Sequence, residues 1–117
     1  MRLPEDAIIS PEKLKGYLLA PRKRNDKSKW LAQEGYNLEN WQTLENDLRN
    51  QLLTKDASFL ESSAYGDLYE IRGTLKGPAG KDLPVCTIWM AETATKITKF
   101  ITMYPDKRRR DHETSAV

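Results

Sequence analysis

The hydrophobic positions divide the chain into a helical first half and a strand-forming second half. Through residue 56 the apolar side chains recur every three or four residues, which predicts helices over 11–20, 27–35 and 38–56. Ser10 and Asn37 are typical N-cap residues, and Pro21 and Gly35 mark the ends of the first two helices. The stripe of the third helix consists of Leu38, Trp41, Leu44, Leu48 and Leu52.

From Tyr65 onward the pattern changes to the alternation of β-strands. It predicts strands over 65–75, 85–91 and 97–104, with a short edge strand at 7–9. Residues 85–91 are apolar on both faces, which is typical of a central strand covered on one side by helices. We therefore expect an α+β fold, with N-terminal helices packed on a three- or four-stranded antiparallel sheet.

Length and charge refine this picture. The 117 residues fit one domain, which we assign to 1–105, followed by a basic tail, 106–117, that lacks an apolar pattern and is expected to be disordered. The net charge is only +2, but basic residues concentrate in two patches, 22–29 and 107–110. The first patch contains Arg22, Lys23, Arg24, Lys27 and Lys29. Such a patch is typical of phosphate binding, and equally of a solvated loop.

Several classes of chemistry are disfavoured by the residue inventory. Cys86 is the only cysteine and lies in an apolar run, so we expect no disulfide and a cytoplasmic location. The only histidine, His112, lies in the tail, which argues against histidine-based catalysis and against a metal site. No apolar run approaches the ~18 residues of a membrane span, and no hydrophobic segment suggests a signal peptide. No cofactor is expected.

The remaining candidates are basic and hydroxyl side chains. If Arg72, Thr87, Thr102 and Tyr104 share one face of the sheet, that face carries a guanidinium, two hydroxyls and a phenol. Metal-independent RNA cleavage requires a proton acceptor, a proton donor and cations that offset the charge on phosphorus. The alternative is that threonine is simply a common strand former and that Tyr104 is an ordinary core or edge aromatic.

Five short motifs carry a resemblance to a known family. They are "KLKGYLLAP", the Ser28-Lys29 pair, "YGDLYEIRGTLKGPAG", "VCTIW" and "TMYP". In this order, over residues 7–105, they resemble a small bacterial family known only as a domain of unknown function. A fainter similarity, through the closing "TMYP", is to the ribonuclease toxins that include barnase, EndoU-type and RelE-type proteins. RelE-type members work with Lys, Arg and Tyr, and Lys29 matches the Ser-Lys position of the first family.

This resemblance implies the first of two hypotheses, a toxin-like, metal-independent endoribonuclease or RNA-binding protein. The candidate catalytic residues are Lys29, Arg72, Tyr65, Thr102 and Tyr104, and the candidate substrate-binding residues are Arg22, Arg24, Lys27 and Thr87. The alternative is a non-enzymatic interaction module, either a partner in a toxin–antitoxin-like pair or a small homodimer, which would use an exposed sheet edge.

Overall fold

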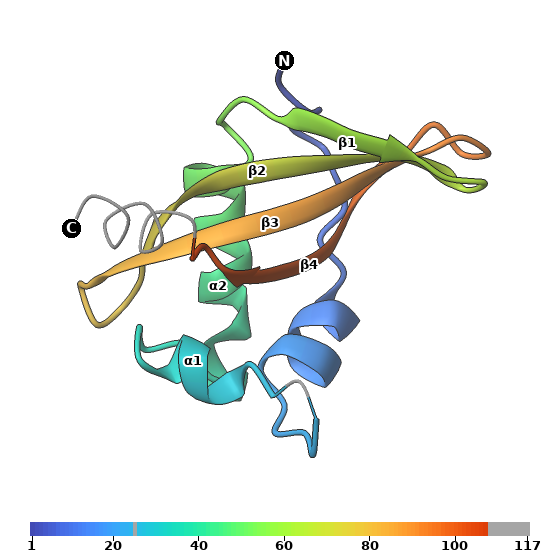
Figure 1. Cartoon of the computed structure of the whole chain (residues 1–117). Coiled ribbons are helices and arrows are strands. Elements are labelled where there is room, and N and C mark those ends of the chain that lie inside the picture. The colour runs from blue at the N-terminus through green and yellow to red at the C-terminus, as the bar shows by residue number, and fades with distance from the viewer. Residues whose placement is uncertain (25, 108–117) are drawn as a thin grey trace.

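The sheet is a four-stranded antiparallel meander in the order β1-β2-β3-β4 (Figure 1). The computed structural model describes residues 1–24 and 26–107. The strands are β1 (Ser58–Ser62), β2 (Gly66–Lys76), β3 (Asp82–Glu92) and β4 (Thr98–Pro105). The helical segments precede the sheet and pack on one of its faces, so the predicted α+β fold is confirmed.

The helical half is built from short segments whose hydrogen bonding changes along the chain. They are η1 (Lys13–Leu18), α1 (Ser28–Ala32), η2 (Leu38–Asn40), α2 (Trp41–Asp47) and η3 (Leu48–Leu52). The single helix expected over 38–56 is therefore three consecutive segments, and the first helix is shorter than expected. Both η1 and η3 are wide π-type turns, closed by N–H groups of Leu19 and Leu53 that donate to carbonyls five residues back.

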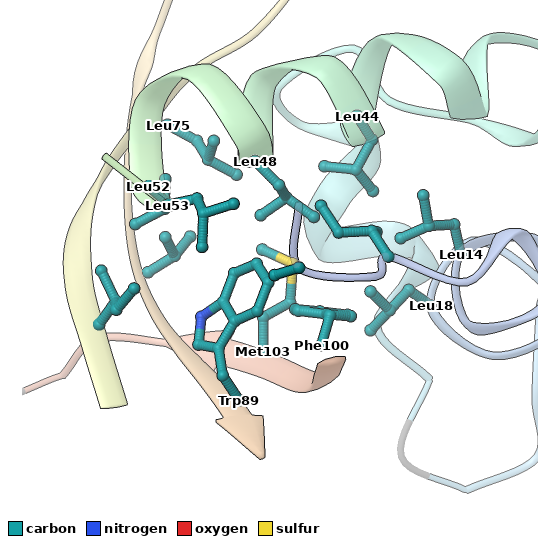
Figure 2. Packing of buried hydrophobic residues seen from close by; sticks show 14 of the residues in the cluster. Leu14, Leu18, Leu44, Leu48, Leu52, Leu53, Leu75, Trp89, Phe100 and Met103 are labelled. Carbon is teal, nitrogen blue, oxygen red and sulfur yellow. The ribbon is translucent and has the colours of Figure 1, made fainter. Parts of the chain in front are cut away.

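The core lies between these helices and the inner face of the sheet (Figure 2). On β2 and β3 the inward residues are the odd-numbered ones, because Ile71 pairs with Thr87 and a strand alternates its side chains. On β4 a bulge at Ile101 switches this parity, so that both Phe100 and Met103 point inward. The labelled core residues are Leu14, Leu18, Leu44, Leu48, Leu52, Leu53, Leu75, Trp89, Phe100 and Met103.

The Thr87 hydroxyl is hydrogen-bonded within this core. Its hydroxyl donates to the carbonyl of Ile71 at 2.9 Å and accepts from the indole N–H of Trp89 at 2.8 Å. Trp89 packs edge-to-face on Phe100, with ring centroids 5.3 Å apart. The expectation of a shared face is therefore wrong for Thr87, which lies on the helix-covered face while Arg72 and Tyr104 lie on the opposite one.

β1 and the expected edge strand at 7–9 differ from the sequence-based expectation. β1 was not predicted, because its five residues are all exposed and carry no buried alternation. Phe59 holds it on β2 through an edge contact with Tyr69, at 5.9 Å between ring centroids. The expected edge strand at 7–9 is reduced to a bridge at Ile8, whose N–H donates to Thr98 and whose carbonyl accepts from Phe100, both at 2.8 Å.

A buried carboxylate fastens the β2–β3 hairpin to the segment after α1. Glu34 is 1% exposed, and its Oε2 accepts from the N–H groups of Gly77 at 2.9 Å and Lys81 at 2.8 Å. Tyr36 lies against the same hairpin, and a Cβ at position 77 would stand 2.6 Å from its ring. Position 77 therefore requires glycine because of this close approach.

Replacing Glu34 by methionine, Glu34→Met, should lower the free energy of unfolding by about 2 kcal/mol, because two backbone N–H groups lose their acceptor. Urea denaturation measures the change. The matched control is Glu61→Met on exposed β1, which should differ from the unmodified protein by less than about 0.5 kcal/mol. Equal losses in the two variants would contradict the role assigned to Glu34.

Candidate functional site

Two groups of polar side chains lie outside the core. The first, which we call the Arg72 cluster, occupies the face of the sheet opposite the helices. It consists of Glu70, Arg72, Cys86, Tyr104 and Asp106. The strand register explains its composition, because Arg72 of β2 pairs with Cys86 of β3, which pairs with Tyr104 of β4.

In the Arg72 cluster the cation is paired with two carboxylates. The guanidinium donates to both carboxylate oxygens of Glu70, at 2.8 and 3.2 Å, and to Asp106 at 2.6 Å. The side chains of Glu70 and Asp106 are only 13% and 8% exposed. One cation facing two carboxylates leaves little attraction for a phosphate, so this cluster acts as an ion-pair network on the sheet.

The thiol and phenol of the Arg72 cluster are held in their protonated forms. Burial, together with the nearby Glu70 carboxylate, raises the pKa of Cys86 to about 11, and its thiol donates to Glu70 at 3.1 Å. A hydrogen bond with Cys86 and burial raise the pKa of Tyr104 to about 12. Neither group is therefore disposed to accept a proton at neutral pH.

The second group, which we call the Tyr17 cluster, lies at the outer edge of β4. Its members are Lys13, Tyr17, Arg22, Lys27 and Thr102. The three cationic groups surround the Tyr17 ring at 5.8, 4.7 and 5.5 Å from its centroid, for Lys13, Arg22 and Lys27 respectively. η1 supplies Lys13 and Tyr17, and the loop after η1 supplies the other two cations.

Lys27 anchors that loop to β4. Its ammonium donates to Thr102 Oγ1 at 3.1 Å and to the carbonyl of Met103 at 2.7 Å. These two bonds use two of the three donors of an ammonium group, and the third is available to the Tyr17 oxygen, with which Lys27 also forms a hydrogen bond. The neighbouring carboxylate, Asp26, accepts from the N–H and hydroxyl of Ser28.

The electrostatics of the Tyr17 cluster favour negative charge. Within residues 1–24 and 26–107, none of its three cations forms a salt bridge, whereas Arg49, Arg72, Lys76 and Lys99 all do. The hydrogen bond with Thr102, reinforced by Lys27 and Arg22, lowers the pKa of Tyr17 below its ordinary value. The phenol thus resides in a locally positive field.

The structure distributes the residues singled out from the sequence over several places. Arg72 and Tyr104 are neighbours in the Arg72 cluster, and Thr102 belongs to the Tyr17 cluster together with Arg22 and Lys27. Lys29 of α1 lines a separate shallow pocket with residues that include Ala32 and Leu38. Tyr65, 74% exposed, lies in the β1–β2 turn, and Arg24 lies exposed in the basic loop.

Tyr17 itself was missed as a candidate. It lies at helical spacing from Leu14 and Leu18, which is typical of a core stripe, although only the two leucines are buried. The available signal was a tyrosine at a half-buried stripe position, followed closely by a basic loop. Asp106, assigned from sequence to the tail, is instead part of the Arg72 cluster, and its N–H donates to Pro84. His112 and residues 108–110 lie outside the described part of the chain.

With the geometry described, comparison with known proteins identifies the family. A family model described as "Domain of unknown function (DUF6883)" matches residues 2–107, so the chain belongs to that family. No curated protein and no solved structure matches the chain. Nothing in these comparisons supports the fainter resemblance to ribonuclease toxins.

Two further properties of the described residues concern membranes and metals. No helix in that part of the chain is long and apolar enough to cross a membrane. In the same residues, no group of three or more His, Cys, Asp or Glu side chains is placed to hold a metal ion.

Replacing Arg72 by methionine, Arg72→Met, should lower the free energy of unfolding by about 2 kcal/mol, because two largely buried carboxylates lose their shared cation. Thermal or urea denaturation measures this. Lys76→Met is the matched control on the same strand, since its ion pair with Asp82 is well exposed and should contribute little. Equal stability of the Arg72→Met variant and the unmodified protein would contradict the prediction.

Replacing Lys27 by methionine should raise the pKa of Tyr17, because the phenolate loses a charge and a hydrogen bond that stabilise it. The carbon-13 signal of the tyrosine Cζ atoms, followed against pH and assigned with a Tyr17→Phe variant, reports the change. Lys81→Met on the β2–β3 hairpin serves as the control and should leave the pKa of Tyr17 unchanged. A Tyr17 titration unaffected by Lys27→Met would refute the coupling.

Proposed function

We propose that this member of a family of unknown function binds single-stranded RNA, and that the Tyr17 cluster holds a phosphate of the RNA backbone. One observation carries the proposal. Three cationic side chains converge on one aromatic ring at the edge of the sheet, and no carboxylate of the described residues forms a salt bridge with them.

The contrast between the two clusters supports the choice of site. In the Arg72 cluster the guanidinium is already bonded to two carboxylates, so an added phosphate would have to compete with existing ion pairs. In the Tyr17 cluster the cations have neutral partners, namely an aromatic ring, a hydroxyl and a carbonyl. A phosphate placed there gains charge-assisted hydrogen bonds without displacing an existing ion pair.

The presence of an aromatic ring among the cations favours a single strand over a duplex. Proteins that bind single strands combine a basic groove with aromatic side chains, because every unpaired base offers a flat face. We restrict the proposal to binding. The ribonuclease hypothesis requires Lys29, Arg72 and Tyr65. These residues lie outside the Tyr17 cluster and have different neighbours.

The alternative, an interaction module or homodimer, rests on β1. This edge strand exposes Phe59 and Leu60, which would suit pairing with another strand. However, a bulge between Phe59 and Glu61 interrupts its regular geometry, and the Glu61 carboxylate lies on the same short edge. Both features oppose strand addition, so we favour RNA binding.

The Arg22→Met variant tests the proposal, because Arg22 is exposed and contributes charge without anchoring β4. Fluorescence anisotropy with a short labelled single-stranded RNA, in EDTA, should show roughly tenfold weaker binding at low salt. The slope of log affinity against log salt should fall by about 0.7 for each lost phosphate contact.

Lys81→Met is the charge-matched control, and its affinity and salt slope should stay close to those of the unmodified protein. Equal affinities of the Arg22→Met variant and the unmodified protein, or no measurable binding by the unmodified protein, would refute the proposal. The same samples, run on a denaturing gel, show whether the RNA is also cut.

A further inference from the structure

A groove lies directly beside the Tyr17 cluster. It has a volume of about 480 Å³, within the range of small-ligand pockets. Its walls come from η1, from the N-terminal segment and from β4, and include Ile8, Gly16, Tyr17, Phe100 and Ile101. The bridge between Ile8 and Lys99 holds the N-terminal segment along β4, and the bulge supplies Ile101 as an extra residue.

Gly16 lines this groove. A glycine inside a helical segment lowers stability relative to alanine. Here neither the backbone nor the packing requires it, because its φ is not in the left-handed region and a Cβ would meet no atom within 4 Å. Gly16 is exposed to solvent at the groove, so its missing side chain leaves that part of the groove open.

The groove and the Tyr17 cluster share two residues, Lys13 and Tyr17. A ligand with one apolar, flat part and one anionic part, separated by a short spacer, would therefore occupy both at once. A nucleotide has this form. The apolar walls suit the faces of a base, and Ser10, Glu12 and Lys99 at the groove offer hydrogen-bonding groups to its edges.

From this arrangement we infer that the groove beside Gly16 binds one unstacked base of the RNA, while the Tyr17 cluster holds the adjoining phosphate. The inference rests on the proposed function and goes beyond it, because it assigns a base-binding site. Base binding in the groove and phosphate binding in the Tyr17 cluster can then be abolished by separate substitutions.

The test compares two ligands and two substitutions. The ligands are a labelled single-stranded RNA and an abasic ribose-phosphate chain of the same length. The Gly16→Leu variant places a bulky side chain at the groove wall, where its Cβ would meet no atom within 4 Å, and should weaken binding of the RNA roughly tenfold, within the range for losing one stacked base. It should bind the abasic chain as the unmodified protein does.

The control is the Gly16→Ala variant, whose single methyl group leaves most of the groove open and should preserve RNA binding. The Arg22→Met variant should bind both ligands more weakly, because both carry phosphates. The inference is overturned if the Gly16→Leu variant binds RNA as the unmodified protein does, or if its affinities for RNA and for the abasic chain fall equally. Failure of the proposed function is distinct, since the unmodified protein would then bind neither ligand.

A competition assay separates base recognition from phosphate recognition in a free ligand. A nucleoside monophosphate should displace labelled RNA from the unmodified protein at lower concentration than ribose 5-phosphate. This difference should disappear in the Gly16→Leu variant and persist in Gly16→Ala. Equal displacement by the two competitors from the unmodified protein would exclude a base-binding groove.

Discussion

The register of β3 between β2 and β4 decides which polar side chains of the sheet face the core and which face away from it. Because side chains alternate across a strand, one register decides which residues face the helices and which do not. It directs Thr87 and Trp89 into the core and leaves Cys86 on the opposite face with Arg72 and Tyr104. A shift of one residue would bury the ions and expose the tryptophan, so the packing around Trp89 strongly selects this register.

The bulge in β4 is the local exception on which the Tyr17 cluster and its groove depend. In a regular strand, Phe100 and Met103 would point to opposite faces, because one position is even and the other odd. The bulge lets both side chains reach the core. The extra residue, Ile101, becomes a wall of the groove, while Thr102 accepts a hydrogen bond from Lys27. Bulges commonly redirect side chains at the edge of a sheet, and this one does so where the basic loop meets β4.

The two clusters show how neighbouring acids decide what a cation does. Arg72 is held between two carboxylates and serves the sheet, whereas among the described residues the cations around Tyr17 form no salt bridge and contact a ring, a hydroxyl and a carbonyl. The basic residues alone do not distinguish these cases, because each cluster combines at least one basic residue with a tyrosine. The difference arises from Asp106, which returns to the sheet after β4 and pairs with an arginine 34 positions earlier in the sequence.

The sequence by itself determined the fold class, because the change from helical to alternating periodicity near Tyr65 is a property of local residue order. It also determined the central place of β3 and the concentration of charge in the loop 22–29. Only the tertiary structure decided the site. Whether a threonine, tyrosine or arginine faces the core, an acid or a groove depends on register, on one bulge and on contacts such as that of Lys27 with Thr102, 75 residues apart. Periodicity along a chain carries no record of such distant contacts.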